Sequence, residues 1–534
     1  MKLMYSVESL GICGISCSLI LSTCTCFTVL NGYDIRYSSG MTISFHGAAR
    51  TVTGSKHIIT LDNGKKLLLD CGMFQGLGEE TLSLNQQLGF DPAEISMLVL
   101  SHAHIDHSGL IPKLVKEGFT GKIICTEATK ELAEILLYDS AEIQSYDNSS
   151  NAKNGASSPL YTSEDVEACL KQFETIDYDQ WIRLNEQVEV MYTHTGHLVG
   201  CAAINIRIRE GRKKTTILYS GDIGRYRSIL LQAPVEPPQA DYIILESTYG
   251  DKRHDISFSL VKSLNYWINK ICVEQKGQLI IPAFSVGRTQ ELLYGLNQLS
   301  LEKRLPEILF FVDSPLSMKA TETIKKYKGE YNERLQQVLA IDDDPFDFPG
   351  LKYVESVEDS RQLVQYKEPC VIISASGTAD AGRVKHHINS CVSQKHCAVL
   401  LAGYCGSRSL GGQLISGARQ VEIFNEMAKV NAEIGQLQGM SAHGDTDDLV
   451  QFLSNQDPEK VKGIFLVHGE HEVQKAFADR LTAKGFKRVE CPNQHQSYPL
   501  PLPRLRKRIP INKEAEVVKM EVKLKKRKKL LANG

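Results

Sequence analysis

The segment from Leu98 to Gly109 constrains the fold most, because it places four potential metal ligands directly after an apolar run: His102, His104, Asp106 and His107. The apolar run is typical of a buried strand. If the chain stays extended beyond it, alternate side chains share one side, so the first three ligands are expected to converge and His107 to face elsewhere. Imidazole and carboxylate groups are common zinc ligands, and this set can hold two adjacent metal ions. The alternative is a polar loop whose histidines are hydrogen-bonded within the protein. Four potential ligands directly after one strand make this alternative a poor explanation.

This His-x-His-x-Asp-His run resembles the signature of the metallo-β-lactamase fold. Later motifs resemble those of its β-CASP branch, the RNA-processing and DNA-processing nucleases that include the 3′-end mRNA cleavage nuclease subunit. The resemblance extends from about Met41 to about Cys491. It implies an α/β chain: a metallo-β-lactamase αββα sandwich over residues 41–248 and 431–500, with an inserted α/β β-CASP domain over residues 249–430.

Composition agrees with a globular protein of more than one domain. The chain has 534 residues, which is more than one ordinary hydrophobic core accommodates. Of these residues 42% are hydrophobic and 23% are charged, a composition that excludes a disordered chain. The cysteines beyond residue 40 are scattered without Cys-x-x-Cys pairs, and several adjoin apolar runs as small core residues do. We therefore expect a reducing compartment and a cytoplasmic location.

The two ends of the chain lie outside the resemblance. Residues 1–40 lack both the charged start of a secretory signal and the apolar length of a spanning helix, so we interpret them as an over-extended start or a dispensable leader. No stable membrane association is expected. Residues 501–534 form a basic tail, which carries +9 from residue 504 onward in a chain of net charge −2. Such a tail is either only a solvated segment or an electrostatic contact for RNA that does not choose sequence.

The remaining metal ligands are assigned by the resemblance together with metal chemistry. Two histidines compete for the third histidine position, and His197 is preferred over His194 because an apolar and small stretch follows it. Asp222, in Ser-Gly-Asp after an apolar strand, has two carboxylate oxygens with which to bridge two cations. The resemblance thus implies two zinc ions per chain, one held by His102, His104 and His197, the other by Asp106, His107 and His468, with Asp222 bridging. Asp70, after another apolar strand, is expected to orient this loop by hydrogen bonding.

The resemblance also implies catalytic and phosphate-binding residues. His443 is expected to donate a proton to the leaving oxygen while Glu246 positions it. Two Gly-Arg pairs in the insert predict phosphate contacts by Arg288 and Arg383, with Ser376 and Gly377 in the same loop region. The alternative is that these arginines only cap or pair within the protein. One segment departs from the family pattern, with Gly412 at a position where many relatives carry arginine.

The expected function is zinc-dependent phosphodiester hydrolysis of RNA, leaving 5′-phosphate and 3′-hydroxyl ends. Endonucleolytic cutting is preferred, and a 5′-to-3′ exoribonuclease is the alternative. A small-molecule metallo-hydrolase of the same superfamily is disfavoured by the long insert, and a non-catalytic scaffold by the complete ligand set. RNA is the expected partner, and a homodimer is left open.

Overall fold

The computed structural model describes residues 40–502, apart from 79, 152–157, 256, 404, 407 and 438. The leader interpreted over residues 1–40 and the basic tail therefore lie almost entirely outside the described residues. From Met41 onward the described residues belong to one compact unit. None of the described helices is both long enough and apolar enough to cross a membrane.

The first lobe contains two seven-stranded sheets. One has the order β22 (Gln496–Pro499), β1 (Thr42–Phe45), β2 (His57–Thr60), β3 (Lys66–Leu69), β4 (Ile95–Val99), β5 (Lys122–Cys125) and β6 (Phe173–Thr175). The other has the order β21 (Val489–Glu490), β20 (Gly463–Val467), β11 (Tyr242–Glu246), β10 (Lys213–Tyr219), β9 (Ala202–Glu210), β8 (Val188–His194) and β7 (Ile182–Arg183). Each sheet therefore takes strands from both ends of the described chain, which explains how His468 can join ligands near residue 100.

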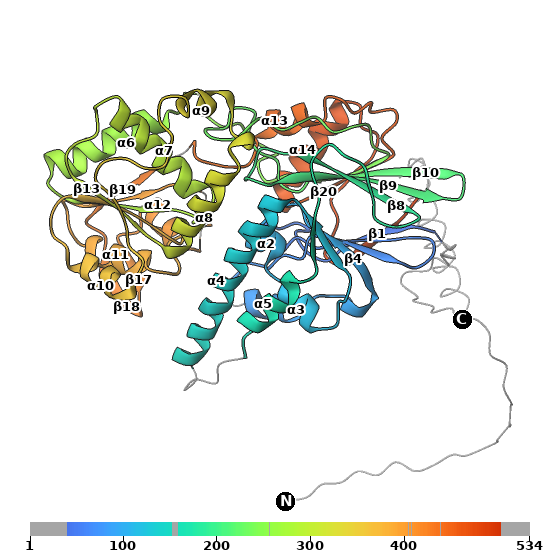
Figure 1. Cartoon of the computed structure of the whole chain (residues 1–534), viewed down its shortest axis with the longest axis horizontal. Helices are drawn as coiled ribbons and strands as arrows, with labels where there is room; N and C mark the ends of the chain where they lie inside the picture. Colours follow the sequence, from blue (N-terminus) through green and yellow to red (C-terminus); the bar gives the residue numbers. More distant parts are fainter. Residues whose placement is uncertain are drawn as a thin grey trace, which may run out of the picture. The chain divides into compact units, whose positions relative to one another are not determined.

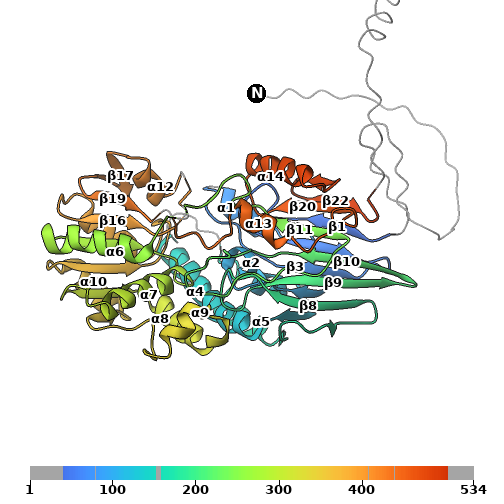
Figure 2. The same cartoon turned by 90° about the horizontal axis from the view of Figure 1, so that it is seen from above.

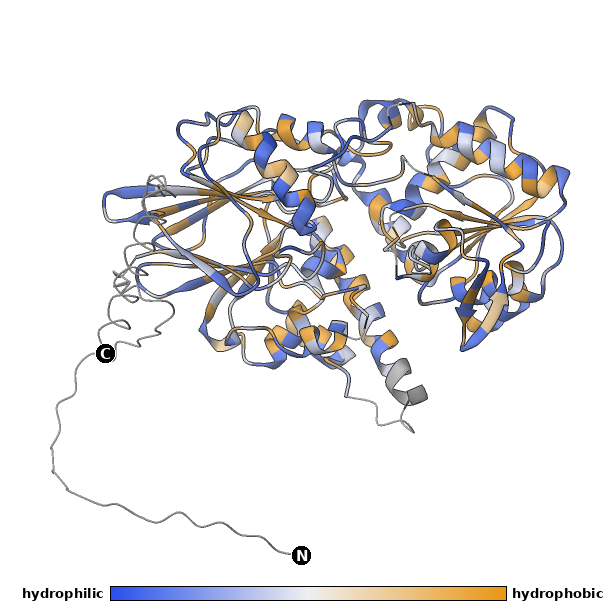
Figure 3. Cartoon of the chain, turned by 180° about the vertical axis from the view of Figure 1, so that it is seen from behind, coloured by the Kyte–Doolittle hydropathy of each residue, from blue (hydrophilic) through white to orange (hydrophobic). Residues whose placement is uncertain are grey.

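Apolar side chains from the two sheets face each other and form a buried core between them. Ile43 and Leu69 of one sheet and Ile204, Ile244 and Phe465 of the other belong to this core, each fully buried. The strands are strongly hydrophobic, whereas the outer helices turn polar residues outward (Figure 3). This two-sided burial is what the short apolar runs between glycines predict.

Helices cover the outer faces of both sheets and complete the αββα sandwich (Figure 1). On one side lie α13 (Thr446–Phe452) and α14 (His471–Ala483), whose Phe452 and Phe477 pack on strands β11 and β20. The helices of the other side are α2 (Ile105–Ser108), α3 (Ile111–Lys116), α4 (Glu127–Asn151) and α5 (Ser163–Leu170). Short helices α1 (Glu80–Gln86) and η1 (Pro92–Glu94) precede β4.

The inserted domain is built on one six-stranded sheet in which every neighbouring pair is parallel. Its order is β14 (Leu351–Tyr353), β13 (Leu309–Asp313), β15 (Cys370–Ser374), β12 (Gln278–Pro282), β16 (Ala398–Leu401) and β19 (Glu433–Gln436). The inserted sheet thus runs past residue 430, where the sequence had suggested that the insert ends. A β17–β18 hairpin (Gln420–Ile423 and Glu426–Lys429) stands apart from it.

Helices lie on both faces of this parallel sheet (Figure 2), as the connections between parallel strands require. One face carries α6 (Leu260–Ile268), its π-helical continuation η3 (Asn269–Glu274), α7 (Arg288–Leu301) and α8 (Pro315–Lys326). The other carries α10 (Val357–Gln365), α11 (Val384–Cys391) and α12 (Leu410–Ile415). Short helices η4 (Lys328–Glu330) and α9 (Glu333–Val338) follow α8.

Helix α4 continues to Asn151 although Asn and Ser, which are weak helix formers, are frequent in its last turns. Residues 127–151 contain neither Gly nor Pro, and weak helix formers alone do not stop a helix that is already propagating.

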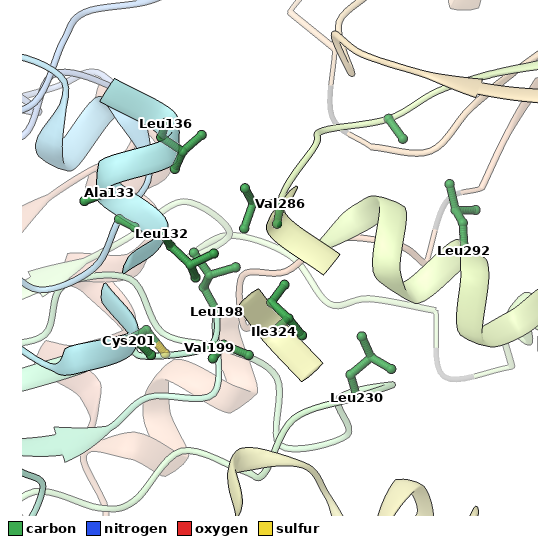
Figure 4. Packing of buried hydrophobic residues seen from close by; sticks show 14 of the residues in the cluster. Leu132, Ala133, Leu136, Leu198, Val199, Cys201, Leu230, Val286, Leu292 and Ile324 are labelled. Carbon is green, nitrogen blue, oxygen red and sulfur yellow. The ribbon is translucent and has the colours of Figure 1, made fainter. Parts of the chain in front are cut away.

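One apolar cluster connects helix α4, the loop that carries His197, and the inserted domain. Leu132 and Leu136 of α4 and Leu198 of that loop lie in the same buried cluster as Val286 and Ile324 of the insert. Figure 4 shows these side chains gathered between the two lobes. Apolar packing therefore fixes the insert against the region where the predicted metal ligands lie.

Candidate metal centre and active site

The residues predicted from the sequence as the first ligands lie close together, but the chain does not reach this arrangement in the expected way. Strand β4 ends at Val99, and residues Ile105–Ser108 form the single helical turn α2 rather than an extended chain. Because of this turn, Asp106 leaves the side of His102 and His104 and joins His107. In a helical turn, successive side chains do not alternate between two sides as they do in an extended chain. Asp106 and His107 can therefore belong to the same ligand group.

Three imidazole rings form the first cluster. His104 Nδ1 lies 3.1 Å from His102 Nε2 and 3.2 Å from His197 Nε2. Burial lowers the pKa of all three rings, that of His104 to about 4, so the rings are neutral, the form in which imidazole binds a metal ion. Two nitrogens on one tetrahedral zinc ion are separated by about 3.3 Å. The donor set therefore fits a metal ion.

Asp222 faces this cluster with one oxygen and a second cluster with the other. Oδ2 lies 3.5 Å from both His102 Nε2 and His197 Nε2. Oδ1 lies 3.2 Å from His107 Nε2 and 3.6 Å from His468 Nδ1. Burial alone would raise the pKa of Asp222, but the surrounding histidines lower it well below its usual value. An ionised carboxylate whose two oxygens face different ligand clusters has the geometry expected of a bridging ligand.

The second cluster joins Asp106, His107 and His468. His468 Nε2 lies 3.2 Å from Asp106 Oδ2. The backbone allows the Asp106 turn to approach only because residue 72 is glycine, since a Cβ at Gly72 would lie 1.6 Å from the Asp106 carbonyl oxygen. Each of the two ligand groups thus combines residues that follow strands of both sheets, and Asp222 lies between the groups.

Asp70 is placed where it can orient His107. Its Oδ2 accepts hydrogen bonds from His107 Nδ1 at 2.6 Å and from the Tyr219 hydroxyl at 2.6 Å, and Ser101 donates through both its backbone N–H and its hydroxyl. With Nδ1 held by Asp70, Nε2 of His107 is directed at Asp222 Oδ1, and, despite burial, the carboxylates around the ring raise the pKa of His107 well above its usual value. A carboxylate behind a metal-binding histidine fixes its tautomer and orientation in this way.

Sequence reasoning missed three supporting side chains: Tyr219, Ser101 and Thr248. Thr248 Oγ1 lies 3.0 Å from His468 Nδ1. Each of the three is within three residues of a predicted site residue at a strand end, and this adjacency was the available signal.

His443 and Glu246 lie together, with His443 Nδ1 3.2 Å from Glu246 Oε1. Burial disfavours the charged ring, but the carboxylates of Glu246 and Asp222 raise the pKa of His443 to about 9. His443 Nε2 is 3.9 Å from Asp222 Oδ2, so the ring borders the metal clusters. Asp222, His443 and His468 also form a third group that could hold an ion, and this group shares two members with the others.

His194, the competing histidine, lies outside these clusters. Its Nε2 is 3.3 Å from Glu330 Oε2, a carboxylate of the inserted domain. The same oxygen accepts a hydrogen bond of 2.8 Å from the Gly200 N–H. His194 ends strand β8, whereas His197 lies in the following loop, and of the two only His197 joins the groups of possible metal ligands found in the described residues.

The two predicted phosphate-binding arginines are occupied by protein groups. Arg288, 7% exposed, donates to Glu291 and to the Met440 carbonyl. Arg383 donates to buried Asp313 at 2.8 Å and to the carbonyls of residues 354 and 355. The structure thus shows the pairing that the sequence had left as the alternative, and phosphate binding by either arginine stays a prediction.

Part of this site borders one cavity of about 1230 Å³ between the first lobe and the insert. Its lining includes the ligands His104, Asp106, His197, Asp222 and His468, together with His443. From the insert it includes Arg288, Ser376 and Arg383, whereas Gly377 lies behind this wall with its Cα facing the Phe284 ring. The cavity gives a substrate access to the metal clusters from the side of the insert.

Family models match three consecutive parts of the chain. The metallo-beta-lactamase superfamily model matches residues 55–259, the Beta-Casp domain residues 289–414, and the Zn-dependent metallo-hydrolase RNA specificity domain residues 427–492. A solved structure of a protein of unknown function from Enterococcus faecalis V583 shares the fold, with a TM-score of 0.50 and 12% identity over 86% of this chain and all of that chain.

Curated relatives match most of the chain. It is 34% identical to a ribonuclease of Thermus thermophilus, over 82% of this chain and 95% of that protein. It is 28% identical to the transcription termination factor FttA of Cenarchaeum symbiosum, over 78% of this chain and 64% of that protein. It is 30% identical to the cleavage and polyadenylation specificity factor 73 of Drosophila melanogaster, over 79% of this chain and 59% of that protein. With its sandwich, its parallel-sheet insert and its paired ligand clusters, the chain belongs to the β-CASP family of metallo-β-lactamase-fold hydrolases.

Proposed function

We propose that the protein is a di-zinc ribonuclease that hydrolyses RNA phosphodiester bonds to 5′-phosphate and 3′-hydroxyl ends. The observation that carries this proposal is the pair of ligand clusters joined by Asp222, with His443 beside them in one cavity. The Thermus relative is named as a ribonuclease, which supports RNA as the substrate and partner.

The residues present fit two zinc ions. His102, His104 and His197 would hold one, Asp106, His107 and His468 the other, and Asp222 would contribute one oxygen to each. Metal ions held there would supply Lewis acidity, which activates water and offsets negative charge on the phosphate. Asp70 would hold His107 as the tautomer that presents Nε2 to a metal ion, and Thr248 contacts Nδ1 of His468.

His443 is assigned the proton transfer. A leaving 3′ oxygen needs a proton, and the ring can deliver one from Nε2 while Nδ1 stays against Glu246. The carboxylate both orients the ring and favours its charged form. Bound cations would lower the pKa of His443 from about 9 toward neutrality, the range in which a general acid works best.

Endonucleolytic cutting is the mode we propose. The cavity arginines that could hold a terminal 5′-phosphate are engaged by Glu291 and Asp313, and Gly412 offers no side chain for that purpose. A 5′-to-3′ exoribonuclease is the competing mode, and it requires such a terminal site.

Two substrates test these statements. With linear RNA, analysis of the product ends should show 5′-phosphate and 3′-hydroxyl, and a 2′,3′-cyclic phosphate would contradict metal-assisted hydrolysis. With circular RNA, cleavage supports the endonuclease. Degradation of linear 5′-monophosphate RNA alone would establish the exonuclease instead.

A cytoplasmic location is also part of the proposal. The ten described cysteines are free thiols, and eight of them are buried, as expected in a reducing compartment.

A further inference from the structure

The cavity contains an aromatic ring that neither the metal chemistry nor the proton transfer uses. Phe284 is 44% exposed, and it lines the same cavity as His104 and His443. Among the large apolar side chains of the described region that are exposed to this extent, only Phe284 and Ile143 line the cavity, and only Phe284 is aromatic. Single exposed apolar residues are common on surfaces, so its setting has to carry the argument.

The backbone holds Phe284 rigidly. It lies in the short connection between strand β12 and helix α7, and its carbonyl accepts hydrogen bonds from Thr289 N at 3.2 Å and Thr289 Oγ1 at 2.9 Å. The preceding Ala283 N–H donates to the Ser374 carbonyl at 3.0 Å. A residue whose backbone is held in this way loses little backbone entropy when a ligand covers its side chain.

Glycine backbone lies behind the ring. A Cβ at Gly377 would lie 2.7 Å from Phe284 Cδ2, and one at Gly403 would lie 3.8 Å from Cε2. Any side chain at residue 377 would therefore displace the ring. This contact explains why residue 377 is glycine without any role in phosphate binding. The exposed part of the ring is directed away from the two glycines.

We propose that Phe284 is a stacking platform for a nucleobase of the RNA substrate close to the scissile phosphate. A flat ring offered at the wall of a nuclease cavity matches the one surface that all four bases share, their π-face, so it adds affinity without choosing sequence. Phe284 thereby sets how the strand lies relative to the metal clusters, and it is a positioning residue. The inference rests on the RNA specificity proposed above.

The test combines protein variants with modified RNA. Phe284→Ala should weaken binding of single-stranded RNA about 5- to 100-fold, the range for one base–aromatic stack, and should raise KM more than it lowers kcat. Phe284→Leu keeps most of the volume without the ring and should weaken binding similarly, whereas Phe284→Trp should keep the affinity. Phe424→Ala is the matched control, because Phe424 is also 44% exposed but does not line the cavity.

A series of RNAs with one abasic residue each locates the stacked base. At one position, loss of the base should weaken binding to the wild-type protein but not to Phe284→Ala, because the contact is already absent. Binding is measured by fluorescence anisotropy on phosphorothioate RNA, with thermal unfolding as a check that each variant folds. Full affinity in Phe284→Leu would show that the side chain acts by packing and would overturn the inference, as would equal effects of Phe284→Ala and Phe424→Ala.

Binding and cleavage together separate this inference from the proposed function. RNA binding that depends on Phe284 without any cleavage would leave the stacking platform in place and refute the nuclease. Cleavage by the wild type with unchanged binding by Phe284→Ala would do the reverse. A protein that neither binds nor cleaves RNA would overturn both.

Discussion

The metal centre and the insert differ in how the buried polar atoms of their motif residues are hydrogen-bonded. Around Asp222, histidine nitrogens face one another, and His107 Nε2 and Asp222 Oδ1 have no hydrogen-bond partner among the described residues. In the insert, Asp313 accepts hydrogen bonds from Arg383, His387 and Ser360 at 2.6–2.8 Å. Both regions are rich in buried polar atoms, but the Asp313 oxygens accept hydrogen bonds from three donors, whereas His107 Nε2 and Asp222 Oδ1 make none with the described residues.

This difference distinguishes residues that can bind an external ligand from residues that stabilise the fold. An unsatisfied polar atom in a buried site costs free energy, so a cluster of such atoms indicates an external partner. Arg383 does not have this free-energy cost, because its guanidinium donates hydrogen bonds to Asp313 and to backbone carbonyls. The comparison predicts that substitutions in the first region act on metal and activity, and those in the second on stability.

The largest effect is expected from His104→Ala. His104 Nδ1 is the nitrogen that lies between His102 and His197, so its loss removes the centre of the first cluster. RNA cleavage should fall to background together with bound metal, measured by elemental analysis. His46→Ala is the control, since its ring lies against His495, outside the ligand clusters. Full activity with metal lost would contradict the metal mechanism.

His443→Ala should be next, with a loss of about 10²–10⁴-fold in kcat and both metal ions retained. The reason is that His443 contacts Glu246 and is assigned to proton transfer rather than to metal binding. Glu246→Gln should reduce kcat less, because the amide can still accept the hydrogen bond. Metal content is measured on the same samples as the rate. Loss of one metal equivalent in His443→Ala would instead make this residue a ligand, through the group that Asp222, His443 and His468 form.

The sequence predicted the first region better than the second, for a physical reason. His102, His104, Asp106 and His107 follow one strand within a few residues, so spacing alone nearly fixes their neighbourhood, and even a wrong assumption about the extended chain left them together. Arg383 also follows a recognisable motif, but its partner Asp313 is distant in sequence. Whether an arginine meets a substrate or a carboxylate depends on such long-range packing. The role of Phe284 depends on Gly377 and Gly403 in the same way, and no local pattern reports it.

A third prediction tests the insert directly. Arg383→Ala should destabilise the protein by about 3 kcal/mol, the low end for breaking a buried pair, because His387 and Ser360 still contact Asp313. The KM for RNA should change little in the folded variant. Arg408→Ala, an exposed arginine of the neighbouring loop, should leave stability unaltered. If Arg383→Ala raised KM strongly without lowering the unfolding temperature, the arginine would be a phosphate ligand after all.

The smallest effect concerns Glu330, where the two regions meet. Its carboxylate comes from the insert and receives the Gly200 N–H of the loop that carries His197, with His194 at 3.3 Å. Glu330→Gln keeps an acceptor for Gly200 but removes the charge beside His194, so we expect a loss of about 1 kcal/mol, equivalent to a roughly fivefold weaker first metal site.

Lys326→Ala is the matched control for Glu330→Gln. It removes another ion pair between the insert and α4, Lys326 with Glu131, but this lysine is 60% exposed. Exposed pairs contribute about 0–1 kcal/mol, so metal affinity should not change. Metal titration of both variants distinguishes a specific hold on the His197 loop from general loosening of the insert. Equal weakening in the two variants would show that any contact between the lobes serves, and that Glu330 has no particular connection to the metal centre.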